Sequence, residues 1–135
     1  MDMPVCLQIH TEQDIVTARH IGRSIAKDFA FGNIEQSRIA TVISELARNI
    51  FLYAYVGTIT IDTIEREGML GLRIQAKDRG PGIPDIRRAM EDGFSTSGGL
   101  GAGLPGVKRL MDEFTIENIL QGTYVSVVKW RREPN

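Results

Sequence analysis

The amino-acid sequence predicts an α+β domain, a two-layer sandwich in which a mixed, mostly antiparallel sheet carries helices on one face. Apolar and polar residues alternate in five short segments, which is the pattern of half-buried strands. Apolar residues recur at helical spacing in two longer segments, and the predicted order is strand, helix, helix, strand, strand, helix, helix, strand, strand. A length of 135 residues is typical of one domain, so we expect residues 1–135 to fold as a single unit.

The first strand and the first helix are predicted near the N-terminus. Val5, Leu7 and Ile9 alternate with more polar residues, and Cys6 between them is expected to be a small core side chain. Thr11 begins the run Thr-Glu-Gln-Asp, which is typical of a helix N-cap with an acid in the first turn. The helix that follows carries its apolar residues at helical spacing, namely Ile15, Ala18, Ile21, Ile25 and Phe29.

A second, longer helix is predicted after residues 31–33, where Phe-Gly-Asn interrupts the first. Asn33 and Gln36 have the spacing of a capping box at its start. We expect this helix to end near Tyr55, before Gly57. Its apolar face carries Ile39, Val42, Ile43, Leu46 and Ile50.

A β-hairpin is predicted over residues 58–78, with Glu67-Gly68 as its turn because glycine tolerates the positive φ of tight turns. One face of its second strand carries Leu70, Leu72, Ile74 and Ala76. Counting on by two reaches Asp78. This carboxylate is therefore expected on the covered face of the sheet, at the strand end, where it needs a partner.

The C-terminal part of the chain is predicted to form two short helices and two further strands. The helices are expected over residues 84–92 and 104–112, and Pro105 is tolerated in the first turn of the second. The strands are expected over residues 114–118 and 123–130.

Composition excludes several classes of function. The net charge of -1 argues against a nucleic-acid binder, which normally carries a basic surface. A lone cysteine excludes an internal disulfide framework and suits a reducing compartment. The sequence has neither an apolar run long enough for a membrane span nor a signal-peptide pattern, so we expect a cytoplasmic protein that binds no membrane.

Glu45 and Asn49 lie four residues apart in the second predicted helix and therefore share one face of it. One interpretation is an exposed pair on a solvated face. The other is a pair aimed into a pocket, where the amide oxygen of Asn49 suits a Mg²⁺ ion that bridges to nucleotide phosphates. Glu45 could then orient or deprotonate an attacking hydroxyl, which is the task of a general base in phosphoryl transfer.

Two glycine clusters follow. Asp78 at its strand end precedes Gly80 and Gly82, and its carboxylate, which only accepts hydrogen bonds, can select the amino group of adenine. Residues 98–106 form a glycine-rich loop that opens a helix, where free amides and the helix dipole favour phosphate. This loop matches G-x-G-x-x-G, but no apolar strand directly precedes it, so a dinucleotide-binding fragment is the weaker alternative.

Together and in this order, the motifs resemble those of the GHKL ATPase superfamily, which includes gyrase, Hsp90, sensor histidine kinases and MutL. The likeness covers nearly the whole chain and rests on Glu45 with Asn49, on Asp78 with Gly80 and Gly82, on a second glycine box at Gly99, Gly101 and Gly103, and on a late Gly-Thr at Gly122-Thr123. Within the superfamily, the short chain resembles the anti-sigma-factor-type serine/threonine kinases of bacteria. Residues 101–114 look most like the stressosome switch kinases of that group.

This resemblance implies a GHKL (Bergerat-type) ATP-binding fold that uses ATP and Mg²⁺ as cofactors. It implies that Asn49 holds Mg²⁺, that Glu45 is the catalytic base and that Asp78 binds adenine. By the same likeness, room for the base comes from Gly80 and Gly82, phosphate contacts from Gly99, Gly101 and Gly103, and part of the adenine pocket from Thr123.

The resemblance also implies a function. Such a kinase transfers the γ-phosphate of ATP to a serine or threonine of STAS-domain proteins and acts as a partner-switching regulator in a stressosome-like pathway. Once released, it activates a PP2C-type phosphatase. The alternative is an anti-sigma factor that sequesters a sigma factor in a nucleotide-gated way. A pocket that only binds would not need Glu45 beside the metal, which favours the kinase.

Overall fold

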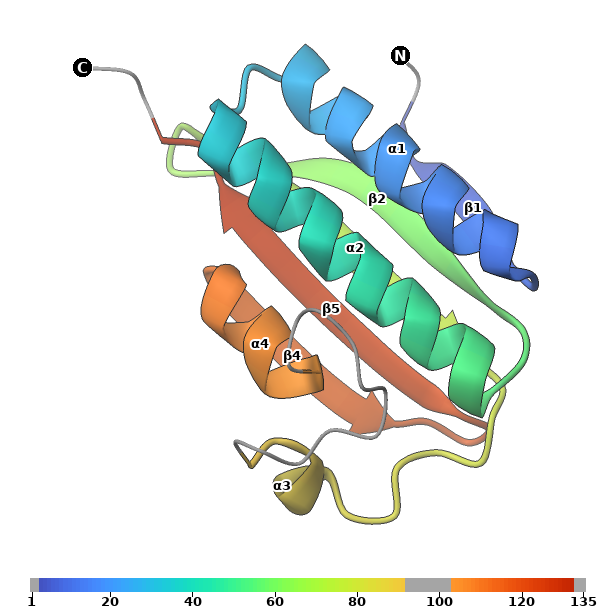
Figure 1. Cartoon of the computed structure of the whole chain (residues 1–135). Helices are drawn as coiled ribbons and strands as arrows, with labels where there is room; N and C mark the ends of the chain where they lie inside the picture. Colours follow the sequence, from blue (N-terminus) through green and yellow to red (C-terminus); the bar gives the residue numbers. More distant parts are fainter. Residues whose placement is uncertain (1–2, 92–102, 133–135) are drawn as a thin grey trace.

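A five-stranded sheet with the strand order β1-β2-β3-β5-β4 forms one layer of the molecule, and helices cover one of its faces (Figure 1). The computed structural model describes residues 3–91 and 103–132. Its strands are β1 (Val5–Ile9), β2 (Gly57–Arg66), β3 (Met69–Asp78), β4 (Glu113–Asn118) and β5 (Thr123–Trp130). Its helices are α1 (Glu12–Asp28), α2 (Asn33–Tyr53), α3 (Ile86–Ala89) and α4 (Gly103–Leu110). The predicted α+β two-layer sandwich is confirmed, and every ladder within the described residues is antiparallel rather than mixed.

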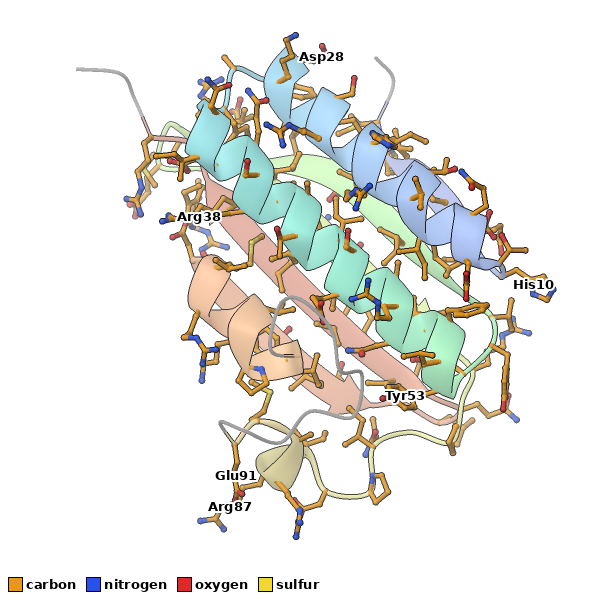
Figure 2. The ribbon with its side chains drawn as sticks, in the orientation of Figure 1. His10, Asp28, Arg38, Tyr53, Arg87 and Glu91 are labelled. Carbon is orange, nitrogen blue, oxygen red and sulfur yellow. The ribbon has the colours of Figure 1, made fainter. Side chains whose placement is uncertain are left out.

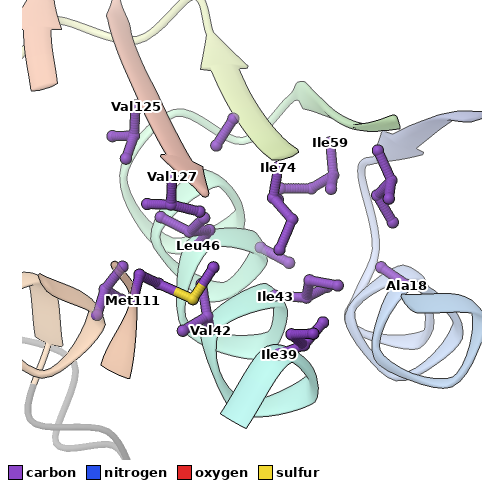
Figure 3. Close-up of a cluster of buried hydrophobic side chains, with 14 of the residues drawn as sticks. Ala18, Ile39, Val42, Ile43, Leu46, Ile59, Ile74, Met111, Val125 and Val127 are labelled. Atoms are coloured by element: carbon purple, nitrogen blue, oxygen red, sulfur yellow. The ribbon is translucent and has the colours of Figure 1, made fainter. Parts of the chain in front are cut away.

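The core lies between the sheet and α2, where the alternation along the strands meets the apolar face of the helix. In the register, Ile59 faces Ala76, and Ile74 faces both Ile61 and Val127, all of them buried. Figure 3 shows the apolar side chains of α2 pointing toward the strands, with Ala18 of α1 on one side and Met111 on the other. Helix α2 is therefore the central element of the helical layer.

The helix starts test the two capping predictions. Thr11 caps α1 as predicted, in a capping box in which its hydroxyl accepts from the Asp14 amide and the Asp14 carboxylate accepts from the Thr11 amide. The predicted box at Asn33 is wrong. Gly32 takes the extended N-cap conformation, so Asn33 is already the first helical residue. The buried Gln36 side chain instead donates to the Phe31 carbonyl at 2.8 Å.

The loops and edges differ from expectation in detail. Cys6 is exposed, because Val5, Leu7 and Ile9 point toward the helices and the residue between them faces away. The turn at Glu67-Gly68 has positive φ at both residues, as a tight hairpin turn requires. The short helix predicted over residues 84–92 is confined to α3.

Among the described residues, no helix combines the length and the apolar character needed to cross a membrane.

Candidate nucleotide-binding site

A cavity of about 380 Å³ opens where α2 passes over the end of β3 and the start of β5. Cavities of roughly 300–1,000 Å³ hold small-molecule ligands in proteins. From the helices and strands, the lining residues are Leu46, Asn49, Ile50, Tyr53, Ala76, Asp78, Ala89, Gly103, Leu104, Thr123 and Val125, and the segment 80–84 lines it too. Figure 2 shows Tyr53 at the C-terminal end of α2, the end of the helix that borders the cavity. Asn49 and Asp78 thus open onto the same hollow, with mainly apolar side chains between them.

The Asp78 carboxylate is held by two backbone amides from different segments. Its Oδ1 accepts from the Gly80 amide at 2.9 Å, which forms a local turn, and from the Thr123 amide at 3.1 Å, which belongs to the neighbouring strand β5. Because both bonds use Oδ1, the second oxygen is available to a ligand that donates a hydrogen bond. Thr123 itself is 7% exposed and lines the same cavity.

The glycines around Asp78 are required first by the protein's own packing. A Cβ on Gly80 would lie 2.7 Å from the Cβ of Ala54, at the end of α2. Gly122 has φ +109, and a Cβ there would lie 1.9 Å from the carbonyl oxygen of Asp78. Gly82 has φ +81, which disfavours any L side chain. Gly80 and Gly82 also line the cavity. A side chain at either position would therefore disturb the packing of the protein and also narrow the space for a ligand.

Glu45 and Asn49 do not form an exposed pair. Glu45 is 1% exposed, and its Oε1 accepts a hydrogen bond from the Arg48 guanidinium at 3.1 Å. Asn49 is half-buried and lines the cavity, whereas Glu45 lies one turn earlier in α2 and is outside the set of lining residues. Arg48 belongs to none of the motifs in the sequence, although the i, i+3 spacing of opposite charges is a signal for this pair.

The predicted phosphate-binding glycines are described only in part. Gly103 begins α4 with φ +68 and lines the cavity. Gly99 and Gly101 lie outside the described residues. The first turn of α4 therefore lines the hollow, and the N-terminus of a helix favours a phosphate because its first amides have no partner within the helix.

The donor set of the cavity suits ATP and a magnesium ion bound through it. Within residues 3–91 and 103–132, no three His, Cys, Asp or Glu side chains form a metal-binding cluster. The Asn49 amide oxygen is a hard ligand, and Mg²⁺ commonly takes one or two protein oxygens and completes its shell with phosphates and water. The single oxygen of Asn49 fits an ion that is shared with the nucleotide phosphates. One protein ligand does not suffice for a metal site made by the protein alone.

Comparison with known proteins identifies the family. Residues 34–133 match the family described as the histidine kinase-, DNA gyrase B-, and HSP90-like ATPase. The chain belongs to this ATPase family. A relative from Bacillus subtilis (strain 168), named serine/threonine-protein kinase RsbT, is 60% identical over 128 residues, which cover 94% of this chain and 96% of that protein. An anti-sigma F factor from Geobacillus stearothermophilus is 33% identical over 103 residues, or 70% of this chain and 69% of the relative.

A solved structure gives the same fold for this member of the ATPase family. The crystal structure of the RsbU and RsbW domains of Rv1364c from Mycobacterium tuberculosis has a TM-score of 0.69 and 17% identity, and the match covers 98% of this chain and 34% of that one. At that identity the likeness concerns the fold alone. Together the matches confirm the predicted superfamily, the predicted fold and the predicted enzyme class, an ATP-dependent serine/threonine-protein kinase.

Proposed function

We propose that this chain transfers the γ-phosphate of ATP to a serine or threonine of a STAS-domain protein and so acts as a partner-switching regulator. One observation carries the proposal: Asn49 and Asp78, from two different elements, open onto one cavity of about 380 Å³, with Glu45 one turn along the same helix. The 60% identity to a serine/threonine-protein kinase supports the same reaction class.

The adenine ring would lie between the apolar side chains of α2 and those of β3 and β5. Asp78 would accept a hydrogen bond from the exocyclic amino group through Oδ2, because Oδ1 already accepts from two backbone amides. Leu46, Ile50 and Val125 would cover the faces of the ring. Guanine presents a keto oxygen at that position and would be repelled by the carboxylate, so the pocket favours ATP over GTP.

Asn49 would hold a Mg²⁺ ion, which when bound neutralises charge on the β- and γ-phosphates. Glu45 would take the proton of the attacking hydroxyl and would be oriented for this task by its bond from Arg48. Gly103 at the start of α4, together with Gly99 and Gly101, would donate backbone amides to the phosphates.

The partners follow from the same proposal. The protein substrate is a STAS-domain protein of a stressosome-like scaffold, and after phosphorylating it the kinase is released to activate a PP2C-type phosphatase. We also propose that residues 1–135 work as one domain and that the protein acts in the cytoplasm.

The test is to incubate the protein with ATP labelled at the γ-phosphate and purified STAS domains, and then to map the labelled residue. The Glu45→Gln variant keeps the shape of the side chain but cannot accept the proton, so we expect transfer to slow by about 10²–10⁴-fold while ATP binding is unchanged. Glu35→Gln at the other end of α2 is the matched control and should transfer at the wild-type rate. Wild-type transfer by Glu45→Gln would exclude this residue as the base.

A second candidate function is an anti-sigma factor, which the 33% identity to anti-sigma F factors supports. In that case a sigma factor would bind the chain in the presence of one nucleotide and leave in the presence of the other. Co-purification with sigma subunits under ATP and under ADP, compared with co-purification with STAS domains and PP2C phosphatases, separates the two functions.

A further inference from the structure

The β4–β5 hairpin makes hydrogen bonds to two different segments that line the cavity. Asn118 and Thr123 face each other across its strands, and the turn is closed by the Ile119 amide, which donates to the Gly122 carbonyl at 3.1 Å. Thr123 donates its amide to Asp78, on the side where the adenine is proposed to bind. Its cross-strand partner, Asn118, makes hydrogen bonds to a different segment of the cavity lining. The pair Asn118–Thr123 therefore connects Asp78 to that second segment.

That second segment is the wall formed by residues 80–84, which lies outside the helices and strands (Figure 1). The Asn118 side chain binds both backbone groups of Ile83: its Oδ1 accepts from the Ile83 amide at 2.8 Å, and its Nδ2 donates to the Ile83 carbonyl at 2.9 Å. The Asn118 side chain thus satisfies both backbone groups of Ile83, as a neighbouring β-strand would. Pro81 and Pro84, on either side, have no amide hydrogen with which to anchor the wall.

The packing of Gly82 shows how closely the wall approaches Asn118. A Cβ on Gly82 would lie 3.0 Å from the Asn118 Oδ1 and 3.4 Å from its Cγ. Gly82 also has φ +81, so a glycine here both permits the turn and leaves room for the Asn118 side chain. The Gly80 end of the wall is held by its amide, which donates to Asp78, and the part from Gly82 to Pro84 is held by contact with Asn118 and not by a helix or strand of its own.

We propose that Asn118 is a positioning residue for the nucleotide, which sets the distance between residues 82–84 of the wall and Asp78, while Gly80 is bonded to Asp78 directly. Asn118 is exposed and is outside the set of cavity-lining residues, so it acts through Ile83 on one side and through its strand partner Thr123 on the other. This inference rests on the proposed function, because it assumes that the cavity holds the nucleotide.

The test compares Asn118→Ala and Asn118→Asp with wild type, and uses Gln121→Ala in the same hairpin as the control. The alanine variant loses both bonds. The aspartate variant keeps the size and the acceptor but loses the donor to the Ile83 carbonyl. For both variants we expect Kd and KM for ATP to rise by about tenfold with kcat unchanged, and the Ile83 amide to exchange with solvent about tenfold faster in the alanine variant. Gln121→Ala should change none of these values.

The outcomes separate this inference from the proposed function. A merely structural role for Asn118 would lower the unfolding temperature and leave the KM for ATP unchanged, which would overturn the inference alone. So would wild-type ATP affinity in Asn118→Asp, the variant with the smaller change in shape. If the wild-type chain binds no ATP at all, both the inference and the proposed function are wrong. Because Asn118 is exposed, neither substitution is expected to prevent folding, and unfolding curves recorded on the same samples check this.

Discussion

The two flanks of α2 are built in opposite ways. Toward α1 the helices pack so closely that a Cβ on Gly22 would lie 2.0 Å from the Cδ1 of Ile43. Toward α4 the same helix borders the cavity of about 380 Å³, into which Asn49 opens. One helix therefore serves a close-packed core on one side and a ligand site on the other.

The glycines on the two flanks show what holds each in place. The nearest neighbours of a Cβ on Gly22 are side-chain atoms of Ile43 and Ile61, whereas those of a Cβ on Gly122 include the backbone carbonyl of Asp78. A side chain can shift or be trimmed, but the backbone of a strand cannot move without moving its neighbours. We therefore expect the close-packed flank to tolerate compensated substitutions and the cavity flank to tolerate few.

The largest effect is expected for Gly122→Ala on the cavity flank. Its φ of +109 strains any L residue, and the added methyl would displace both the carbonyl of Asp78 and its Oδ1, which would be 2.8 Å away. We expect the free energy of unfolding to fall by about 3 kcal/mol, measured by urea denaturation. ATP binding, measured by calorimetry, should weaken by tenfold or more, because a loss of about 1.4 kcal/mol corresponds to tenfold.

Gly68→Ala is the control for strain alone. Gly68 has φ +81 in the β2–β3 turn, and no heavy atom lies within 4 Å of the position of an added Cβ. This variant should lose about 1 kcal/mol of stability and keep its ATP affinity. If Gly122→Ala behaves like Gly68→Ala in both measurements, the contact with Asp78 does not matter and the contrast between the flanks is lost.

A smaller effect is expected for Gly22→Ala on the close-packed flank. Alanine favours a helix by about 1 kcal/mol over glycine, but crowding in a packed core costs about 1–3 kcal/mol, so stability should fall by about 1 kcal/mol. ATP affinity should not change. Introduced into an Ile43→Val background, which lacks the Cδ1 atom, the same substitution should be neutral or stabilising by up to about 1 kcal/mol.

The double-mutant cycle tests whether Ile43→Val compensates for the loss of stability caused by Gly22→Ala. Coupling of about 1–2 kcal/mol between Gly22→Ala and Ile43→Val in urea unfolding would show that the clash is with one side-chain atom. Additive effects would mean that the helix backbones themselves are in the way, and the two flanks would then not differ in kind.

The close-packed flank and the sheet were predictable from the sequence because their signals are local and periodic. Alternation in β1, β2 and β3 and the spacing of the apolar residues in α2 follow directly from the geometry of strands and helices. The cap at Thr11 was predicted for the same reason. One error came from a one-residue shift, because Gly32 takes the N-cap position that the pattern assigns to Asn33. The other concerned Cys6, which the alternation of Val5, Leu7 and Ile9 already places on the opposite face but which was expected in the core for its side-chain type.

The residues of the cavity flank could be identified from the sequence only where they belong to a recognisable motif. Asp78 at a strand end and Asn49 on a helix could be singled out from their own surroundings. Asn118 could not, because its partner Ile83 is 35 residues away and an exposed asparagine carries no pattern that indicates such a contact. Gly122 is part of a motif in the sequence, but its physical reason, the close approach of β3, is not encoded in any local spacing.

The smallest effect is expected at the start of α1, where the capping box is exposed. Hydrogen bonds from the backbone amides of Thr11 and His10 hold the pKa of Asp14 below its ordinary value of 3.8. A carboxylate with a lowered pKa in the folded state adds stability above its ordinary pKa, and this is lost as the pH falls through the lowered value. The stability difference between wild type and Asp14→Asn, from urea unfolding at a series of pH values, should therefore be constant near neutrality and shrink below about pH 4.

Glu12→Gln is the matched control, because Glu12 carries the same charge in the same first turn but is outside the capping box. Its effect should be smaller at neutral pH, since it reports the helix dipole alone. Neither variant should alter ATP affinity, because the start of α1 belongs to the flank that faces away from the cavity. A change in ATP affinity in Asp14→Asn would mean that the packing of α1 is transmitted through α2 to Asn49, and the two flanks could no longer be treated as independent.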